Sequence, residues 1–422
     1  MLNEKFILDD FCITGNTVAD FDNTIAEIAT RTSFVACNSE ELAVLSLFEH
    51  PHAKPNTLYF RVLKPMECPS ITGTLSNKGV AVECNKILKY GNFQPLIDEI
   101  LNETGVIFHD SARSLYVSKK VLTTKLQPFG IGGDFLGEKS FERDLMIAKS
   151  FSKKLDRTLV IREFNGVHKI FSILGPKYIP LPQKILTDIY RQLPTSSLGK
   201  AECHSWEITH FHSGIKIEFP EKAEELQVLY GLPKKFIPGI ILETSDTGDC
   251  SIRIRSTWRY GASTTLHSAV EKKHSGTISV PKVLEEVDDK IFAEYTKLPE
   301  ALCDLMSQDV TDPAWDLSVR HDRIQNRSKI ESVVKNAFKK LKIVEAIGKK
   351  AEATLYKQLV AEFDPSIAYT AYDIATAIMT LPERVEGAHQ LTMDKLSAAV
   401  GRAPYIKYEG KTSAASSIVL VA

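Results

Sequence analysis

Three arginines stand at alternate positions in the segment CSIRIRSTWRY, which follows the turn-forming residues TSDTGD. Because successive side chains of a strand point to opposite faces, Arg253, Arg255 and Arg259 are predicted to share one face, with apolar side chains on the other. Guanidinium groups can hold phosphates by bidentate hydrogen bonds, which makes this face a candidate nucleic-acid site. The cations that follow in the sequence extend this candidate site: Lys272, Lys273 and His274.

The same arginines have a second interpretation. A strand face rich in arginine is often a solvated face whose cations pair with neighbouring acids. Glu218 and Glu243 lie in adjacent predicted strands and could supply such partners. Both interpretations stay open at the level of the sequence.

A second basic segment lies in residues 335–350, where six lysines accompany the single acid Glu345. The candidate contact residues are Lys335, Lys339, Lys340 and Lys342, with Lys349 and Lys350 beyond them. An amphipathic helix with this charge could lie along a nucleic-acid backbone, with an affinity that falls as salt rises. The alternative is a solvated helix whose lysines pair with the acidic segment EEVDD at 285–289.

Two histidines, His210 and His212, are predicted to project from one face of a strand, and such a pair could supply two zinc ligands. A third ligand could come from His267, His274 or Asp246, none of which the sequence places. Exposed or hydrogen-bonded imidazoles are the commoner role for such residues. The pair is therefore a weak candidate metal site.

The segment FGIGGDFLGEKS places Gly132 and Gly137 at phosphate-loop spacing, but Glu138 stands where the loop needs its lysine. A hinge or the start of a helix is favoured.

Asp246 begins an Asp-Thr-Gly triplet of the kind found in aspartic proteases, yet the triplet occurs once and is typical of a turn. Since no nucleophile or metal-nuclease pattern is present, we expect a non-catalytic protein without a cofactor.

The bulk composition limits the function classes. The 422 residues carry 52 Lys and Arg against 53 Asp and Glu, so any binding to nucleic acid or an acidic membrane must use local patches. The seven cysteines are dispersed and odd in number, which is typical of reduced thiols in a cytosol. The start resembles no signal peptide, and no apolar run approaches roughly 18 residues. We expect a soluble cytoplasmic protein without a membrane segment.

The elements that must position these residues are predicted as an α+β fold, with a mixed, largely antiparallel sheet core and a helical C-terminal layer. The expected division is 1–128, a mixed α/β region; 129–157, a glycine-rich hinge and helix; 158–283, the α+β core; and 284–422, a helical region with a short tail. Helices are expected at 38–49, 93–102 and 183–192, and strands at 57–63 and 114–122. The apolar end of the tail SAASSIVLVA could add an edge strand.

Several motifs together resemble a known family. They are TLVIREFNGVHKIFSILGPKYIPLP, PGIILETSDTGDCSIRIRSTWRYG, EKKHSG and, near the C-terminus, TAYDIATAIMTLPE. Over residues 155–400 the chain is similar to the phage- and plasmid-borne group called domain of unknown function 932. It departs from the family pattern at Thr376, where asparagine is usual, and in RSTWRYGAST, which lacks the family's cysteine and asparagine.

The resemblance implies a protein of a phage or mobile element, made in a bacterial host cell. With the two basic patches it predicts a non-catalytic protein that binds single- or double-stranded DNA in recombination, replication or host take-over. One alternative is a structural or assembly protein of a phage, as a homo-oligomer or with phage partners. Another is a metal-dependent hydrolase centred on His210 and His212.

Overall fold

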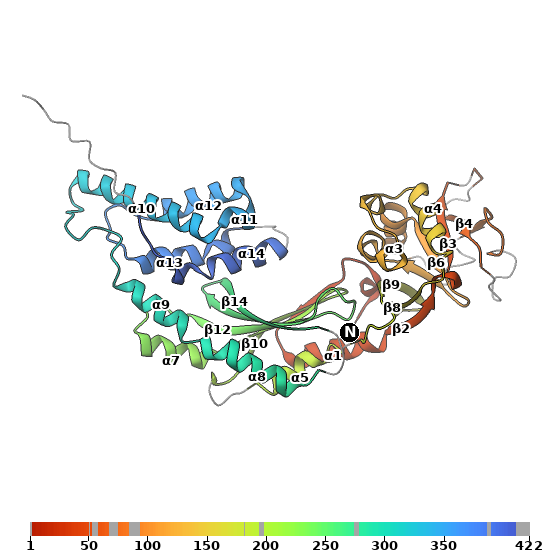
Figure 1. Cartoon of the computed structure of the whole chain (residues 1–422), viewed down its shortest axis with the longest axis horizontal. Coiled ribbons are helices and arrows are strands. Elements are labelled where there is room, and N and C mark those ends of the chain that lie inside the picture. The colour runs from red at the N-terminus through yellow and green to blue at the C-terminus, as the bar shows by residue number, and fades with distance from the viewer. Residues whose placement is uncertain are drawn as a thin grey trace, which may run out of the picture.

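The computed structural model describes residues 2–49, 51–52, 58–66, 75–83, 93–180, 182–193, 198–273, 278–385 and 390–410. Figure 1 shows an open arc with a mixed lobe at one end, a central sheet with helices beneath it, and a layer of C-terminal helices above the other end of that sheet. The predicted α+β class, with largely antiparallel sheets and a helical C-terminal region, is confirmed.

The central sheet, sheet A, has six strands that are all antiparallel to their neighbours, in the order β1-β10-β11-β12-β13-β14. They are β1 (Cys12–Gly15), β10 (Glu202–Thr209), β11 (Ser213–Glu218), β12 (Ile237–Thr244), β13 (Ile252–Tyr260) and β14 (Ser263–Lys272). Apolar side chains alternate along these strands, so one face of the sheet is buried in the main core. The opposite face carries most of the charged side chains of the sheet.

The lobe contains sheet B, with eight strands in the order β2-β8-β9-β7-β6-β3-β4-β5. The strands are β2 (Thr32–Asn38), β3 (Ala43–Phe48), β4 (Tyr59–Lys64), β5 (Ala81–Glu83), β6 (Val106–His109), β7 (Ser114–Val117), β8 (Asp156–Phe164) and β9 (Val167–Leu174). Only the β7–β9 pair of this described sheet is parallel.

The helix predicted at 38–49 is wrong, because Ala43–Phe48 forms strand β3. This apolar run is buried within sheet B, and a short buried strand and a short buried helix have the same apolar pattern in sequence. The strand predicted at 114–122 ends earlier, at Val117, and a helical turn follows at Val121–Lys125. The other predicted elements fall where β4, α3 and α5 lie.

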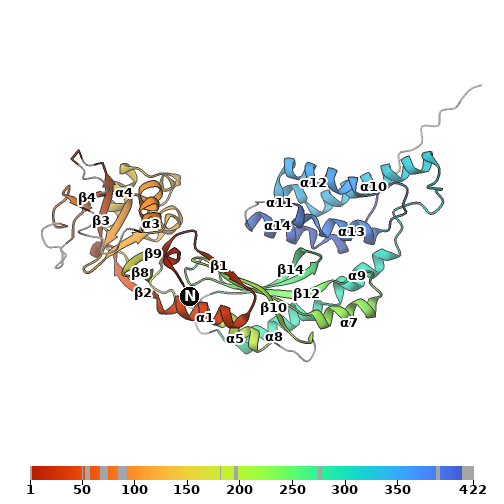
Figure 2. The same cartoon turned by 180° about the vertical axis from the view of Figure 1, so that it is seen from behind.

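Helices cover both sheets. Those before the C-terminal layer are α1 (Val18–Thr30), α3 (Gln94–Glu99), α4 (Phe141–Ser150), α5 (Ile185–Arg191), α7 (Pro220–Tyr230), α8 (Val280–Lys290) and α9 (Lys297–Met306). The C-terminal layer consists of α10 (Arg320–Leu341), α11 (Ile343–Ile347), α12 (Lys349–Ala361), α13 (Ala371–Met379) and α14 (Gln390–Val400). Figure 2 shows α1, α5, α7 and α8 beneath sheet A and the C-terminal layer above it.

The chain crosses twice between the two sheets. Strands β8 and β9, which the sequence places with the 158–283 core, pair with β2 and β7 of the lobe. Strand β1, from the first twenty residues, pairs instead with β10 at the edge of sheet A. The lobe and the central sheet are therefore built from interleaved segments and share their connections.

A buried polar network lies where the sheets meet. Arg162 of β8 is fully buried, and its Nη2 donates to both carboxylate oxygens of Asp246, at 2.8 and 3.0 Å. Its Nη1 donates to Nδ1 of His210, whose Nε2 in turn donates to the carbonyl of Leu8 at 2.9 Å. Asp246 lies in the β12–β13 turn and His210 in the β10–β11 turn, so one guanidinium of sheet B binds two turns of sheet A.

We expect Asp246→Ala to lower the free energy of unfolding by about 3–5 kcal/mol, because it leaves the buried Arg162 charge without its carboxylate. Urea denaturation followed by circular dichroism measures the change. Asp289→Ala is the matched control, since this exposed aspartate of α8 should change stability by at most about 0.5 kcal/mol. Equal effects of the two substitutions would contradict the role given to the network.

Candidate anion-binding cavity between sheet A and the C-terminal helices

The three arginines of β13 share one face of sheet A, as predicted, but each has a carboxylate partner. Arg253 Nε lies 2.6 Å from Glu271, and Arg255 Nη2 lies 2.7 Å from Glu243. Arg259 holds Glu218 by two hydrogen bonds of 2.7 and 2.8 Å. This arrangement is the one expected for a face of paired charges. Phosphate binding by these arginines stays a prediction.

The ion pairs hold the acids in their charged form. Burial opposes ionisation of Glu243, but a hydrogen bond from His212 and the charge of Arg255 outweigh it and keep the pKa of Glu243 below its usual range. Arg255 also extends its Nη1 to Asp394 of α14, at 2.7 Å. The arginine face therefore links the sheet to the C-terminal layer.

The cations predicted to extend the arginine face have separate positions. Lys272 forms an ion pair with Glu286 of α8, one of the acids of the 285–289 segment. Lys273 is exposed at the end of β14, and His274 lies outside the described residues. Lys272, which was predicted to extend the patch, is therefore paired with an acid of a helix of the same chain.

The basic segment 335–350 is not one helix. Helix α10 ends at Leu341, Lys342 adopts the left-handed conformation with φ of 57°, and Gly348 separates α11 from α12. Lys335 and Lys339 are exposed on α10 with no ion pair among the described residues. Lys340 donates to the carbonyl of Lys407 and lies 4.0 Å from Glu409. The lysines predicted to lie on one helix thus lie on α10, between α10 and α11, and at the start of α12.

The two histidines proposed as metal ligands lie in the turn between β10 and β11, so the strand alternation used to pair them does not apply. Both ring nitrogens of His210 have protein partners, and His212 Nε2 lies 3.1 Å from Glu243. Within the described residues, no group of three or more His, Cys, Asp or Glu side chains could hold a metal ion. The hydrolase alternative loses its geometric basis in this part of the chain.

The glycine-rich segment begins a helix. Ser140 accepts a hydrogen bond from the backbone N–H of Arg143 and caps α4, while Lys139 binds the carbonyl of Leu101. A phosphate loop would need this lysine to point at the phosphate. The segment therefore leads into the start of a helix, as the sequence favoured over a phosphate loop. The turn predicted at Asp246 is also present.

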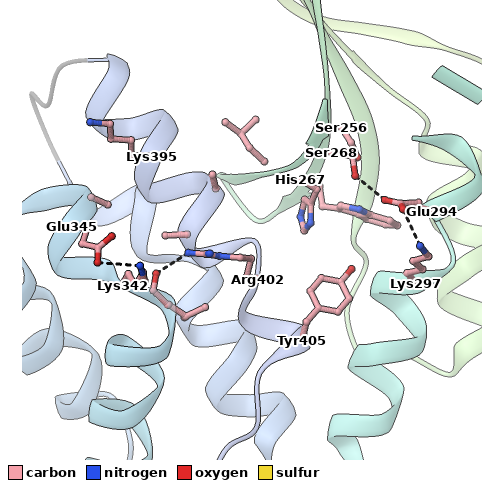
Figure 3. Close-up of a pocket in the computed structure, with 16 residues that line it drawn as sticks. Ser256, His267, Ser268, Glu294, Lys297, Lys342, Glu345, Lys395, Arg402 and Tyr405 are labelled. Carbon is pink, nitrogen blue, oxygen red and sulfur yellow. Dashed lines mark hydrogen bonds and ion pairs between the residues drawn. The ribbon is translucent and has the colours of Figure 1, made fainter. Parts of the chain in front are cut away.

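A cavity of about 840 Å³ lies between sheet A and the C-terminal layer. Figure 3 shows the side chains around it: Ser256, His267 and Ser268 from the sheet, Glu294 and Lys297 beside them, and Lys342, Glu345, Lys395, Arg402 and Tyr405 from the helical layer. An apolar part of the wall is formed by Trp258, Leu266 and Ala399. The volume falls within the range of about 300–1,000 Å³ typical of ligand sites.

An irregularity in sheet A lies at this cavity. Between the pairs Arg255–Ala269 and Thr257–Leu266, β13 has one residue and β14 has two, so β14 bulges. The residues of the bulge, Ser256, His267 and Ser268, all line the cavity. A bulge redirects side chains and locally ends regular pairing, and bulges are common beside binding sites.

Cations outnumber acids in the cavity wall. Lys297, Lys342, Lys395 and Arg402 face two acids, Glu294 and Glu345. Glu294 lies 2.9 Å from Lys297, and Glu345 lies 3.3 Å from Lys342. Lys395 is exposed and has no ion pair among the described residues, and Arg402 donates one hydrogen bond, of 3.0 Å, to the carbonyl of Leu341. The excess charge suits an anion.

Of these four cations, the sequence pattern predicts only Lys342 as a binding residue. Lys297, Lys395 and Arg402 stand singly on α9, on α14 and after α14, so none lies in a local cluster. Only the folding of the C-terminal layer onto β14 brings them to one cavity. No pattern of spacing in the sequence predicts that convergence.

Two titratable rings of the cavity are neutral near pH 7. Burial lowers the pKa of His267 to about 4, so its imidazole adds no charge, and its Nε2 lies 3.0 Å from the Thr265 hydroxyl. Desolvation of the hydroxyl end of Tyr405, a residue that is half exposed as a whole, also raises its pKa to about 12, so its hydroxyl keeps its proton and can donate a hydrogen bond. The positive charge of the cavity therefore comes from lysine and arginine.

No similar protein was found for this chain. No protein-family model matches the chain, and neither the curated proteins nor the solved structures contain a match. The resemblance to the phage and plasmid family stays a prediction based on its motifs. No helix in the described part of the chain has the length and apolar character needed to span a membrane.

The cavity depends on a close approach of backbone to backbone. At Gly401, just after α14, an added Cβ would lie 2.6 Å from the carbonyl oxygen of Leu266 in β14 and 3.2 Å from His267 Nε2. Only glycine fits at this distance without a shift of the strand or the helix. Gly401 thus allows α14 to lie directly on the bulged strand.

We expect Gly401→Ala to lower the free energy of unfolding by about 1–3 kcal/mol, because the methyl group must displace backbone atoms. The matched control is Gly137→Ala, where a Cβ would meet nothing within 4 Å. Urea denaturation of both variants measures the difference. Equal stability of the two variants would show that α14 is not held against β14 as the structure places it.

Stability is also expected to fall in acid because of His210. Burial and the adjacent Arg162 charge hold the pKa of His210 well below its usual value near 6.5. Below about pH 6.5 the unfolded chain therefore binds a proton that the folded chain does not, and the free energy of unfolding decreases as pH falls. Between pH 7 and 5 this one group should contribute a loss of about 1–2 kcal/mol.

Urea denaturation of the wild type and His210→Gln at pH 7, 6 and 5 measures this contribution. The variant should be less stable at pH 7, because glutamine cannot reproduce both imidazole contacts, but its stability should change less with pH. Near-ultraviolet circular dichroism shows whether the variant keeps its tertiary packing. Parallel pH profiles for the two proteins would contradict the assignment.

Proposed function

We propose that the protein binds nucleic acid without catalysis, through phosphate contacts in the cavity between sheet A and the C-terminal helices. The observation that carries the proposal is the convergence of Lys297, Lys342, Lys395 and Arg402 on one cavity. The resemblance to a phage and plasmid family supports a role in DNA transactions. Recombination, replication and host take-over are the processes in which such binding would be used.

Phosphate is the anion that best suits these groups. Within the described residues Arg402 donates one hydrogen bond, which leaves most donors of its planar guanidinium available, and Lys395 offers an exposed ammonium on α14. Glu294 and Glu345 already balance Lys297 and Lys342, so the uncompensated charge lies with Lys395 and Arg402. Each phosphate bound there releases counterions, which favours a polyanion over a single anion.

The surface beyond the cavity extends the proposed contact. Lys339 and Lys335 stand three and seven residues before Lys342 and are exposed on α10. Lys335 and Lys339 are four residues apart and so lie on one side of α10, which ends at Leu341 in the cavity wall. Arg253, Arg255 and Arg259 are left out of the proposed contact, because carboxylates of the same chain already bind them.

Fluorescence anisotropy of labelled single- and double-stranded oligonucleotides, at roughly 50 and 200 mM salt, tests the proposal. We expect salt-sensitive binding to at least one of them. Lys395→Ala/Arg402→Ala should weaken it and reduce the slope of log affinity against log salt by roughly 1 to 2, because up to two phosphate contacts are lost.

Lys153→Ala/Lys154→Ala is the matched control, since it removes two exposed lysines that follow α4 in the other lobe. This control variant should bind as the wild type does. Equal losses in the two double variants would mean that the attraction is spread over the surface. Absence of binding to every oligonucleotide at the lower salt would refute the proposed function.

A further inference from the structure

We infer that the cavity takes single-stranded nucleic acid and stacks one unpaired base on Tyr405. The inference rests on the proposed function and specifies which form of nucleic acid the cavity accepts. It comes from the position of one exposed aromatic ring among the cations of the wall. Figure 3 shows the Tyr405 ring at the cavity, between Arg402 and the pair formed by Glu294 and Lys297.

The accessibility of the aromatic side chains singles out Tyr405. The cavity wall contains Trp258 and Tyr405. Trp258 is only 2% exposed and packs edge-on against Tyr295, with ring centroids 5.5 Å apart, so no ligand can reach its face. Tyr405 is 50% exposed, although large apolar and aromatic side chains are usually covered. An exposed ring at a cavity can serve as a stacking surface.

The neighbours of Tyr405 fix its orientation. It ends the short 3-10 helix η10 (Ala403–Tyr405), which packs against α9 and α13. His267 of the β14 bulge meets the ring edge-on, with centroids 6.5 Å apart and planes at 84°. Because this histidine is neutral, the contact brings no charge to the ring. The ring is therefore presented by packed elements, which lowers the entropy lost when a base stacks on it.

Cations lie in the same cavity wall as this ring. Arg402 precedes Tyr405 by three residues, and its hydrogen bond to the carbonyl of Leu341 holds it beside Lys342. Leu266 and Ala399 supply an apolar wall for the edge of a base. Proteins that bind single strands combine a cationic groove for the backbone with aromatic rings for the bases.

A duplex cannot use the ring in this way. In double-stranded DNA each base already stacks on its neighbours, so a side chain reaches a base face only if the step is unstacked at a cost in free energy. An unpaired base meets no such cost. The phosphate contacts act on both forms, whereas the ring acts only on the single strand, and this difference predicts a preference for single strands.

The experiment compares a labelled 20-nucleotide oligo-dT with a duplex of the same length in fluorescence anisotropy, using full-length wild type, Tyr405→Ala and Tyr405→Phe. We expect Tyr405→Ala to weaken oligo-dT binding by roughly 5- to 150-fold, which is the range for loss of one stacked base. Duplex affinity should change less than about twofold. Tyr405→Phe keeps the ring and should recover most of the affinity that Tyr405→Ala loses.

Phe141→Ala is the matched control, because it removes an exposed ring of α4 in the other lobe. Circular dichroism melting confirms that each variant is folded. If Tyr405→Ala binds oligo-dT like the wild type while Lys395→Ala/Arg402→Ala still weakens binding, the inference is wrong and the proposed function stands. If the wild type binds neither oligonucleotide, both are wrong.

Discussion

The buried guanidinium of Arg162 is the group on which the arrangement of the two sheets depends. It belongs to β8 of the lobe, but its partners, Asp246 and His210, belong to turns of sheet A. A buried charge is tolerated only when it is paired and hydrogen-bonded, so both turns must keep their positions for the fold to be stable. Other lysines nearby are also paired with carboxylates. Lys120 and Lys125 form ion pairs with Asp249, and the fully buried Lys169 forms ion pairs with Asp9 and Glu99. These ion pairs therefore fix the position of sheet B relative to the turns of sheet A, which apolar packing alone would not specify.

The C-terminal layer shares the main apolar core with sheet A, and a few polar contacts and one close approach fix its position at the other end of the sheet. Arg255 reaches Asp394 of α14, the Ser263 hydroxyl donates to the carbonyl of Met379, and Gly401 lets the chain after α14 touch β14. The bulge in β14 interrupts the flat sheet surface at this contact. A helix that rests on a bulged strand cannot cover it evenly, and the cavity occupies the space that remains. The same contacts that dock the layer thus create the site.

The sequence predicts features that depend on near neighbours. The alternation in IRIRSTWRY predicts a strand with arginines on one face, and that face is present because strand geometry is local. It does not reveal whether a phosphate or Glu218 meets Arg259, since the partner comes from another strand. The apolar run Ala43–Phe48 is compatible with a helix or a strand, and its pairing within sheet B determines that it is a strand. The cavity is the extreme case, because its four cations are spread over a span of more than 100 residues, from Lys297 to Arg402, and no local pattern joins them.

Charge pairing also explains why one surface is a better candidate for a ligand than another. Along β13 each arginine has a carboxylate within 2.7 Å, so a phosphate arriving there would have to displace an acid that is already bound. At the cavity, by contrast, Lys395 and Arg402 are exposed, and in the part of the chain that the structure describes neither has an ion pair that an anion would displace. This difference affects the free energy of binding. A cation that must first give up an ion pair loses that interaction, and the loss offsets part of the affinity gained from the phosphate. A strand rich in arginine can thus serve the fold, while a few scattered cations that meet at a bulge remain available to a polyanion.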